Sequence, residues 1–300
     1  MHLDVALIVA GAAVGTLMGL TGVGGGALMT PLLVLAFGVS PASAITADLV
    51  ATVMLRPWGV ALHWRHGIEW RLVTWLSVGS VPAAIAGTYL LHRLGASPGT
   101  RQVLREVLGG ALVLGALAMA ARLARPRRNA SAQHVTVRRA ATVAVGVGAG
   151  VLVGLTSVGA GSLVAVALVV LYPRLRAERL VATDLAQSLP LTVAAGLGAI
   201  TFGHVDASIC AALVLGGVPG VAMGSWASAR VPATLVRGAV TLLVGAAGVV
   251  YLGPRGSVLA LAVALALGAG ARAARRRRRS VPETVEGVVA ALPARLHRDA

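Results

Sequence analysis

The sequence of 300 residues contains no lysine, a single cysteine and few aromatic side chains. The lone cysteine, Cys210, excludes an intrachain disulfide and therefore a disulfide-rich secreted scaffold. Charged residues are also scarce, at 12% of the chain, which is about half of their usual share in soluble proteins. Hydrophobic residues make up 57% instead. This composition excludes a disordered chain and an ordinary cytosolic enzyme, and it predicts a polytopic membrane protein.

Acidic residues are fewer than basic ones: the chain has 10 acidic residues and 26 arginines, which give a net charge of +16. Six arginines lie between Arg122 and Arg139, and eight lie between Arg272 and the C-terminus. Arginines that flank apolar segments are typical of cytoplasmic loops. We therefore expect a cytoplasmic joint and a cytoplasmic tail, with the lipid bilayer as a partner rather than nucleic acid. A nucleic-acid or anionic-lipid role for the run Arg275–Arg279 stays open.

Glycine is abundant, with 38 residues, and it interrupts the longest apolar blocks. A spanning helix needs about 20 apolar residues. Blocks 5–37 and 141–171 exceed one crossing but contain glycine breaks, so we expect each to form two short helices that meet within the membrane. Single crossings are expected at 44–62, 71–91, 106–121, 181–202, 207–229, 235–252 and 256–271.

The two broken blocks resemble each other, which indicates an internal repeat. The segment Gly15–Gly26 aligns with Gly150–Gly161, and Asp48 faces Asp184 in the next apolar segment of each half. Several matched features in the same order predict a tandem duplication. Each half would hold a broken helix pair and three further spans, an odd arrangement that inverts one half against the other. The predicted fold class is an all-α polytopic membrane protein with inverted repeats, a recurring plan of secondary transporters.

Loop charges support this arrangement. With the N-terminus outside, most arginine-rich loops fall inside, and the loop 92–105 disagrees because it carries three arginines. The expected segments are a first membrane repeat at 1–121, a basic cytoplasmic connecting loop at 122–140, a second membrane repeat at 141–252, an additional transmembrane helix at 253–271 and an arginine-rich cytoplasmic tail at 272–300.

The glycine-rich turns are the first candidate for a substrate site. Unwound backbone within a membrane is tolerated where protein buries it or where it lines an aqueous cavity. Its exposed N–H groups suit an anion, and close helix packing through small residues is the alternative. The residues expected to bind substrate in the two turns are Thr21, Gly22, Gly24, Gly25, Gly26, Thr156, Ser157, Gly159 and Gly161.

Polar residues within apolar segments form the second candidate. Asp48 and Asp184 are expected to relay a coupling proton or another ion, and the alternative is that both cap helices. Arg56 offers positive charge to an anion or pairs with Asp48, and the alternative is that it extends to the membrane interface. Gln187 and Ser188 are expected either to hydrogen-bond the substrate or to tie helices together. No cofactor or metal is expected, because no complete ligand cluster stands out.

These motifs carry a resemblance to a known family. The string Gly19–Leu28 with Pro31 shortly after it, its degenerate copy in the second half, and the Gly-x-Val-Pro strings at 79–82 and 216–219 resemble the TauE/SafE family of sulfite and organosulfonate exporters. The resemblance covers roughly residues 8 to 252. It implies an integral plasma-membrane permease with two homologous halves that moves small sulfur-containing anions.

Two positions depart from the first-half motif. Val166 is the counterpart of Pro31, and Ala160 is the counterpart of Gly25, so the second turn is expected to be less open. The predicted function is a secondary transporter for a small anion in the bacterial cell membrane, not an enzyme. Since the sequence has no ATPase motif, an ion gradient would drive it, or the protein is a facilitator. The alternative is a non-transporting membrane assembly or anchoring subunit.

Overall fold

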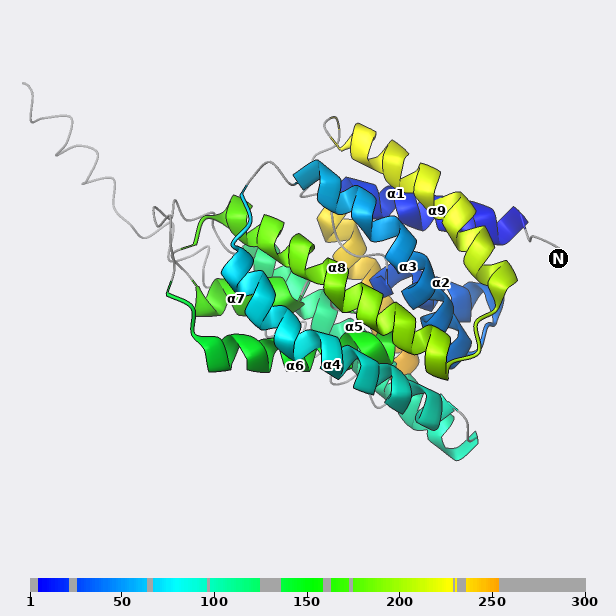
Figure 1. Cartoon of the computed structure of the whole chain (residues 1–300). Coiled ribbons are helices and arrows are strands. Elements are labelled where there is room, and N and C mark those ends of the chain that lie inside the picture. The colour runs from blue at the N-terminus through cyan, green and yellow to red at the C-terminus, as the bar shows by residue number, and fades with distance from the viewer. Residues whose placement is uncertain are drawn as a thin grey trace, which may run out of the picture. The chain divides into compact units, whose positions relative to one another are not determined.

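The computed structural model describes residues 5–21, 26–63, 67–95, 98–124, 136–158, 163–172, 175–228, 230 and 236–253. Over these ranges the chain is all-helical (Figure 1). The helices are α1 (Val5–Thr21), α2 (Gly26–Phe37), α3 (Pro41–His63), α4 (Trp70–Gly95), α5 (Pro98–Ala124), α6 (Arg139–Thr156), α7 (Leu163–Leu171), α8 (Ala177–Phe202) and α9 (Ala207–Ala227), followed by a further helix, Val236–Gly253.

Six helices in the described ranges are long and apolar enough to cross a membrane. These spans are Trp70–Gly95, Gln102–Ala121, Arg139–Thr156, Arg179–Phe202, Ala207–Ala227 and Val236–Gly253. Helix α3 has sufficient length, with 23 residues, but it carries Asp48 and Arg56 and is not one of the six. The expected span 256–271, the tail 272–300 and most of the connecting loop lie outside the described residues.

Both overlong apolar blocks are broken as the glycine pattern predicts. Helix α1 ends at Thr21 and α2 begins at Gly26, while α6 ends at Thr156 and α7 begins at Leu163. Ser157 stops α6 by adopting the left-handed conformation, with φ of 57°, and its N–H donates to Val153 O. A left-handed residue after the last turn is a common way for a helix to end.

The expected loop 92–105 is mostly helical, which corrects the sequence interpretation. Helix α4 continues to Gly95 and α5 already begins at Pro98. Arg101 and Arg105 therefore belong to the first turns of α5 rather than to a loop. Proline suits the first turn of a helix, because its missing N–H would have no intrahelical partner there. The arginines obscured this start because they interrupt the apolar pattern.

The two halves pack against each other reciprocally. Helix α1 lies along α9, and α6 lies along α4 in the same manner (Figure 1). A Cβ atom on Gly216 of α9 would lie 1.9 Å from Ile8 O, and one on Gly79 of α4 would lie 2.3 Å from Val143 O. These helices touch backbone to backbone, which requires small residues. The contact of α1 with α9 thus has a counterpart in that of α4 with α6, while the tandem duplication and the inverted orientation stay predictions.

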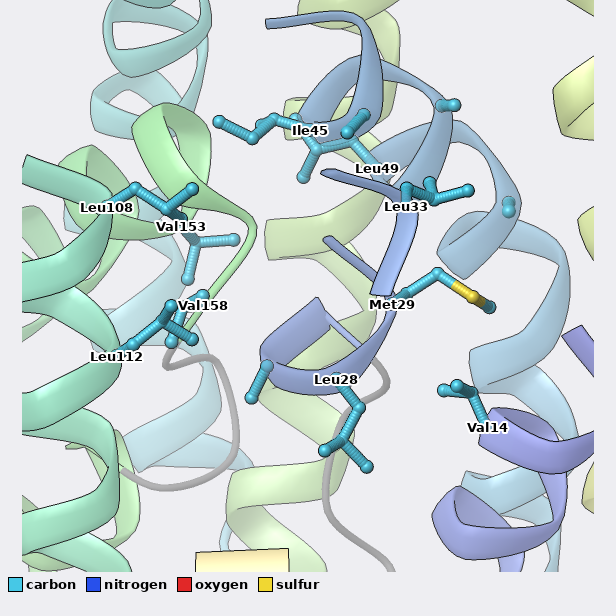
Figure 2. Close-up of a cluster of buried hydrophobic side chains, with 14 of the residues drawn as sticks. Val14, Leu28, Met29, Leu33, Ile45, Leu49, Leu108, Leu112, Val153 and Val158 are labelled. Atoms are coloured by element: carbon cyan, nitrogen blue, oxygen red, sulfur yellow. The ribbon is translucent and has the colours of Figure 1, made fainter. Parts of the chain in front are cut away.

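A hydrophobic core holds the broken helices in place (Figure 2). Met29 and Leu33 of α2 are fully buried, as are Ile45 and Leu49 of α3. At the end of α6, Val158 is also fully buried, in the cluster that includes side chains of α5. Burial of one large aliphatic side chain contributes about 1.5–3 kcal/mol. This core fixes the start of α2 and the end of α6, where the two halves approach each other.

Candidate substrate and coupling site

Buried polar side chains concentrate on α3 and α8, which pack against each other. In an apolar chain such burial is costly unless the groups are paired or used. Ten of the buried polar residues on α3, α8 and their neighbours are Thr30, Asp48, Thr52, Arg56, Ser80, Ser157, Asp184, Gln187, Ser188 and Thr192. We call this set the polar cluster.

Asp48 is held by hydroxyl groups on both of its carboxylate oxygens. It is fully buried on α3. Thr30 of α2 donates to Oδ2 at 2.9 Å, and Thr52, one turn further along α3, donates to Oδ1 at 3.1 Å. The carboxylate therefore links α3 to the second helix of the first broken pair. Hydroxyl donors stabilise a carboxylate, and each bond to a charged group contributes about 1.5–3 kcal/mol.

Neither aspartate caps a helix, so that alternative is wrong. Helix α3 begins at Pro41 and α8 begins at Ala177, which makes Asp48 and Asp184 the eighth residue of each helix. A cap residue precedes the first turn. Both carboxylates are at most 3% exposed. The sequence misplaced them because each helix begins before its apolar stretch.

Arg56 is buried within the polar cluster, so its extension to the interface is also wrong. Its side chain is 6% exposed. The carboxylate of Asp184, on the neighbouring helix, and then that of Asp48 stabilise its positive charge. Its Nε makes no hydrogen bond within the described part of the chain. The guanidinium is thus a buried cation whose counter-charges come from both halves of the chain.

The two polar residues of α8 have different partners. Gln187 donates from Nε2 to Ser80 Oγ on α4 at 2.9 Å, which ties two helices together. Its Oε1 makes no hydrogen bond with any residue in the described ranges. Ser188 donates to Leu185 O within its own helix at 2.6 Å. Its hydroxyl hydrogen is therefore already used, and the oxygen can only accept from a ligand.

The ends of the two broken pairs meet beside this cluster. A Cβ atom on Gly26, the first residue of α2, would lie 1.9 Å from the carbonyl oxygen of Ser157. Ser157 also neighbours Asp48. The hydroxyls of Thr21 and Thr156 donate to Leu17 O and Leu152 O in their own helices. The other expected turn residues, Gly22, Gly24, Gly25, Gly159 and Gly161, lie outside the described residues.

Thr30, Thr52 and Ser80 are cluster members that sequence reasoning missed. The four-residue spacing between Asp48 and Thr52 was the available signal, because residues so spaced are neighbours on a helix. Thr30 and Ser80 reach the cluster only through tertiary packing. Over the described ranges, no group of three or more histidine, cysteine and acidic side chains is arranged to hold a metal ion.

The chain is similar to known proteins that are named as membrane transporters. A family model described as "Sulfite exporter TauE/SafE" matches residues 7–251. A Bacillus subtilis protein named "Probable membrane transporter protein YjnA" is 40% identical over 235 residues, which cover 76% of this chain and 91% of the relative. A second, "Probable membrane transporter protein YdhB" from the same organism, is 26% identical over 239 residues, or 79% of this chain and 96% of the relative. No solved structure matches the chain.

Proposed function

The chain belongs to the TauE/SafE family and is a multi-pass membrane transporter, and we propose that it carries a small anion by alternating access, driven by an ion gradient. The names of the family and of its relatives support transport over the alternative of an assembly subunit. The family description further suggests a sulfur-containing anion such as sulfite or an organosulfonate. The location we propose is the bacterial cell membrane, with the basic joint and the tail in the cytoplasm.

One observation carries the proposal: Arg56 is buried in the polar cluster, where carboxylates from both halves of the chain stabilise its positive charge. A buried cation in a membrane protein is costly and marks a substrate or ion pathway. Arginine is also suited to oxyanions, because its planar guanidinium donates several hydrogen bonds in a fixed arrangement. We assign Arg56 to the anion, with Gln187 and the turn residues Gly26 and Ser157 beside it.

Charge balance supplies the coupling. With Arg56 protonated and both aspartates ionised, the three side chains carry 1 − 2 = −1 charge. An arriving anion would bring a second negative charge into a medium of low dielectric constant, where repulsion is strong. A proton on Asp48 or Asp184 removes this penalty. Anion and proton are therefore expected to bind together, which makes proton-coupled transport the mechanism.

The halves provide the movement. Small residues let α1 slide along α9 and α6 along α4, while α3 and α8 cross at the polar cluster. Rocking of one repeat against the other around a fixed central site is the usual form of alternating access. In this mechanism the anion stays near Arg56 while access changes from one membrane face to the other.

Flux of radiolabelled sulfite into proteoliposomes tests the proposal. The full chain is purified, reconstituted and compared with protein-free liposomes, with and without an imposed pH gradient. We expect saturable sulfite uptake that increases with the gradient, with sulfate and a small organosulfonate as competing anions. Absence of flux for all three anions would contradict the proposal and favour the assembly-subunit alternative.

A further inference from the structure

A polar cavity lies apart from the polar cluster. It has a volume of about 250 Å³ and lies where the first turn of α3 meets the last turns of α4 and α8. Its buried part is lined by Thr46 and Thr88, whose hydroxyls donate to Ala42 O and Ile85 O, and its more exposed part contains the imidazoles of His92 and His204. We call it the imidazole pocket. None of these four residues has a role in the transport mechanism above.

The two imidazoles come from different helices and lie face to face. The ring of His92, near the end of α4, stacks on that of His204, just after α8, with centroids 6.2 Å apart and planes 7° from parallel. Each ring carries at least one N–H donor whatever its protonation state. Two such donors at the mouth of one cavity suit a ligand that is rich in acceptor oxygens.

The charges around the pocket also favour an anion. Among the described residues, no aspartate or glutamate lines it. Asp48 and Asp206 each lie two residues from a residue that lines the pocket. Asp48 belongs to the polar cluster, and Asp206 accepts hydrogen bonds from Ser208 and from the N–H of Ile209, which hold its pKa below the usual range. Its charge is therefore fixed at the start of α9. Arg93, next to His92, donates to Tyr89 OH at 2.9 Å and adds positive charge nearby.

The pocket is not a by-product of the internal repeat. Asp48 and Asp184 are 136 residues apart, and the same offset places Arg176 and Arg179 opposite Ser40 and Ser43. Ser40 and Ser43 line the pocket and bond each other at 2.8 Å. The second half therefore carries bulky cations where the first half has small hydroxyls, so the pocket is particular to one end of the molecule.

We propose that the imidazole pocket is a second binding site for a small oxyanion, which receives the substrate at the membrane face before it reaches Arg56. The inference rests on the proposed anion transport. Thr46, in the buried part of the pocket, precedes Asp48 by two residues on α3. The pocket and the polar cluster thus share one helix, with Thr46 and Asp48 about 3 Å apart along its axis and on different faces.

Equilibrium dialysis of ³⁵S-sulfite against the purified full chain in detergent tests the pocket directly. We expect the unmodified chain to bind a second anion besides the one at Arg56. The double variant His92→Ala/His204→Ala and the pocket-filling variant Ser43→Phe should each lose this second anion. The expected weakening is at least tenfold, as for the loss of one charge-assisted hydrogen bond.

Two further variants separate a binding role from a structural one. His92→Gln/His204→Gln keeps side-chain N–H donors and should restore part of the second binding. Thr201→Ala, on the exposed face of the last turn of α8 and outside the pocket, should leave both anions bound.

Sulfite binding that is the same in all of these variants would overturn the proposal that the imidazole pocket binds an anion, even if flux is normal. Binding of only one anion by the unmodified chain would overturn it as well. A pocket that binds sulfite in a chain without flux would instead overturn the proposed function. The two inferences can therefore fail separately.

Discussion

Asp48 and Asp184 occupy matched positions but have different surroundings. Thr52 donates to Asp48 one turn along α3, whereas Ser188, at the matched position of α8, donates to Leu185 O instead. Thr30 adds a second donor to Asp48 from α2. The repeat therefore supplies two acids that are alike in sequence but unlike in hydrogen bonding. We expect them to have distinct roles in coupling.

Replacement of Asp48 by asparagine should uncouple transport from the pH gradient. The amide is similar in size but cannot take up the proton, so we expect gradient-driven sulfite uptake to fall by roughly tenfold or more, in line with losing a stabilisation of about 1.5–3 kcal/mol. Counterflow of sulfite without a gradient should be less affected. Asp206→Asn is the matched control, since this acid is exposed and lies outside the cluster. An equal loss in both variants would contradict the role of Asp48.

Removal of the Arg56 charge should destabilise the fold as well as abolish transport. Arg56→Leu removes a buried cation that the carboxylates of Asp184 and Asp48 stabilise, and removal of one charge from such a buried group costs about 3–5 kcal/mol. In the double variant Arg56→Leu/Asp184→Asn one buried carboxylate charge is removed too, so part of the stability should return. Thermal unfolding in detergent measures the stability of both variants. If the double variant is less stable than Arg56→Leu alone, the charges do not compensate each other.

The sequence could identify the charged members of the cluster but not their neutral partners. Asp48, Arg56 and Asp184 stand out because ionisable residues are rare in apolar segments. Threonine and serine do not stand out, since most of them bond their own helix backbone. Thr21 and Thr156 do so here, while Thr30 reaches across to Asp48. Only tertiary contacts distinguish the two cases.

At the scale of elements, helix α9 depends on glycines that face α1. A Cβ atom on Gly220 would lie 2.3 Å from Ala12 O, whereas Gly238, on the helix Val236–Gly253, has nothing within 4 Å of such an atom. The glycine at position 220 therefore lets α9 approach α1 closely, whereas the glycine at position 238 is not needed for a close helix contact.

Gly220→Leu should separate α1 from α9, while Gly238→Leu serves as the matched control. Overpacking of a close contact costs about 1–3 kcal/mol or more. Thermal unfolding of the purified chain should show a lower midpoint for Gly220→Leu and an almost unchanged midpoint for Gly238→Leu. Equal midpoints would show that the close approach of α1 and α9 is not required.

Helix breaks were easier to predict than helix ends. Glycines within an apolar block that exceeds one crossing imply a break, and both breaks lie where expected. The ends of α3 and α5 were misplaced because polar residues of their first turns, such as Ser43 and Arg101, interrupt the apolar pattern. Hydropathy does not show whether such a turn packs against neighbouring helices or lies at the membrane face.

At the scale of the whole molecule, composition alone predicted the membrane, whereas the reciprocal packing of α1 on α9 and of α6 on α4 could not be read from it. Matched glycines suggest equivalent helices but not which helix each one contacts. Backbone contact between them fixes the partners, because a Cβ atom would not fit at either crossing.

The proposed orientation places the segment before α6 on the cytoplasmic side of the membrane and the start of α9 on the outer side. Thr136, before α6 on the basic side, and Ala207, at the start of α9, are both exposed. In a Cys210→Ser background, a membrane-impermeant thiol reagent added to intact cells should label Ala207→Cys and not Thr136→Cys. Permeabilised cells, in which both should react, provide the control. The reverse pattern, or labelling of both from outside, would contradict the orientation.

The central claim is that a proton and an anion occupy the polar cluster together, and proton movement in proteoliposomes tests it most directly. Sulfite is added outside vesicles that contain a pH-sensitive dye, with no imposed gradient and with the membrane voltage clamped by a potassium ionophore. We predict that the lumen acidifies as sulfite enters, with a rate that saturates with sulfite, and that Asp48→Asn takes up sulfite without this acidification. Sulfite uptake by the unmodified chain with no proton movement beyond that of protein-free vesicles would contradict it.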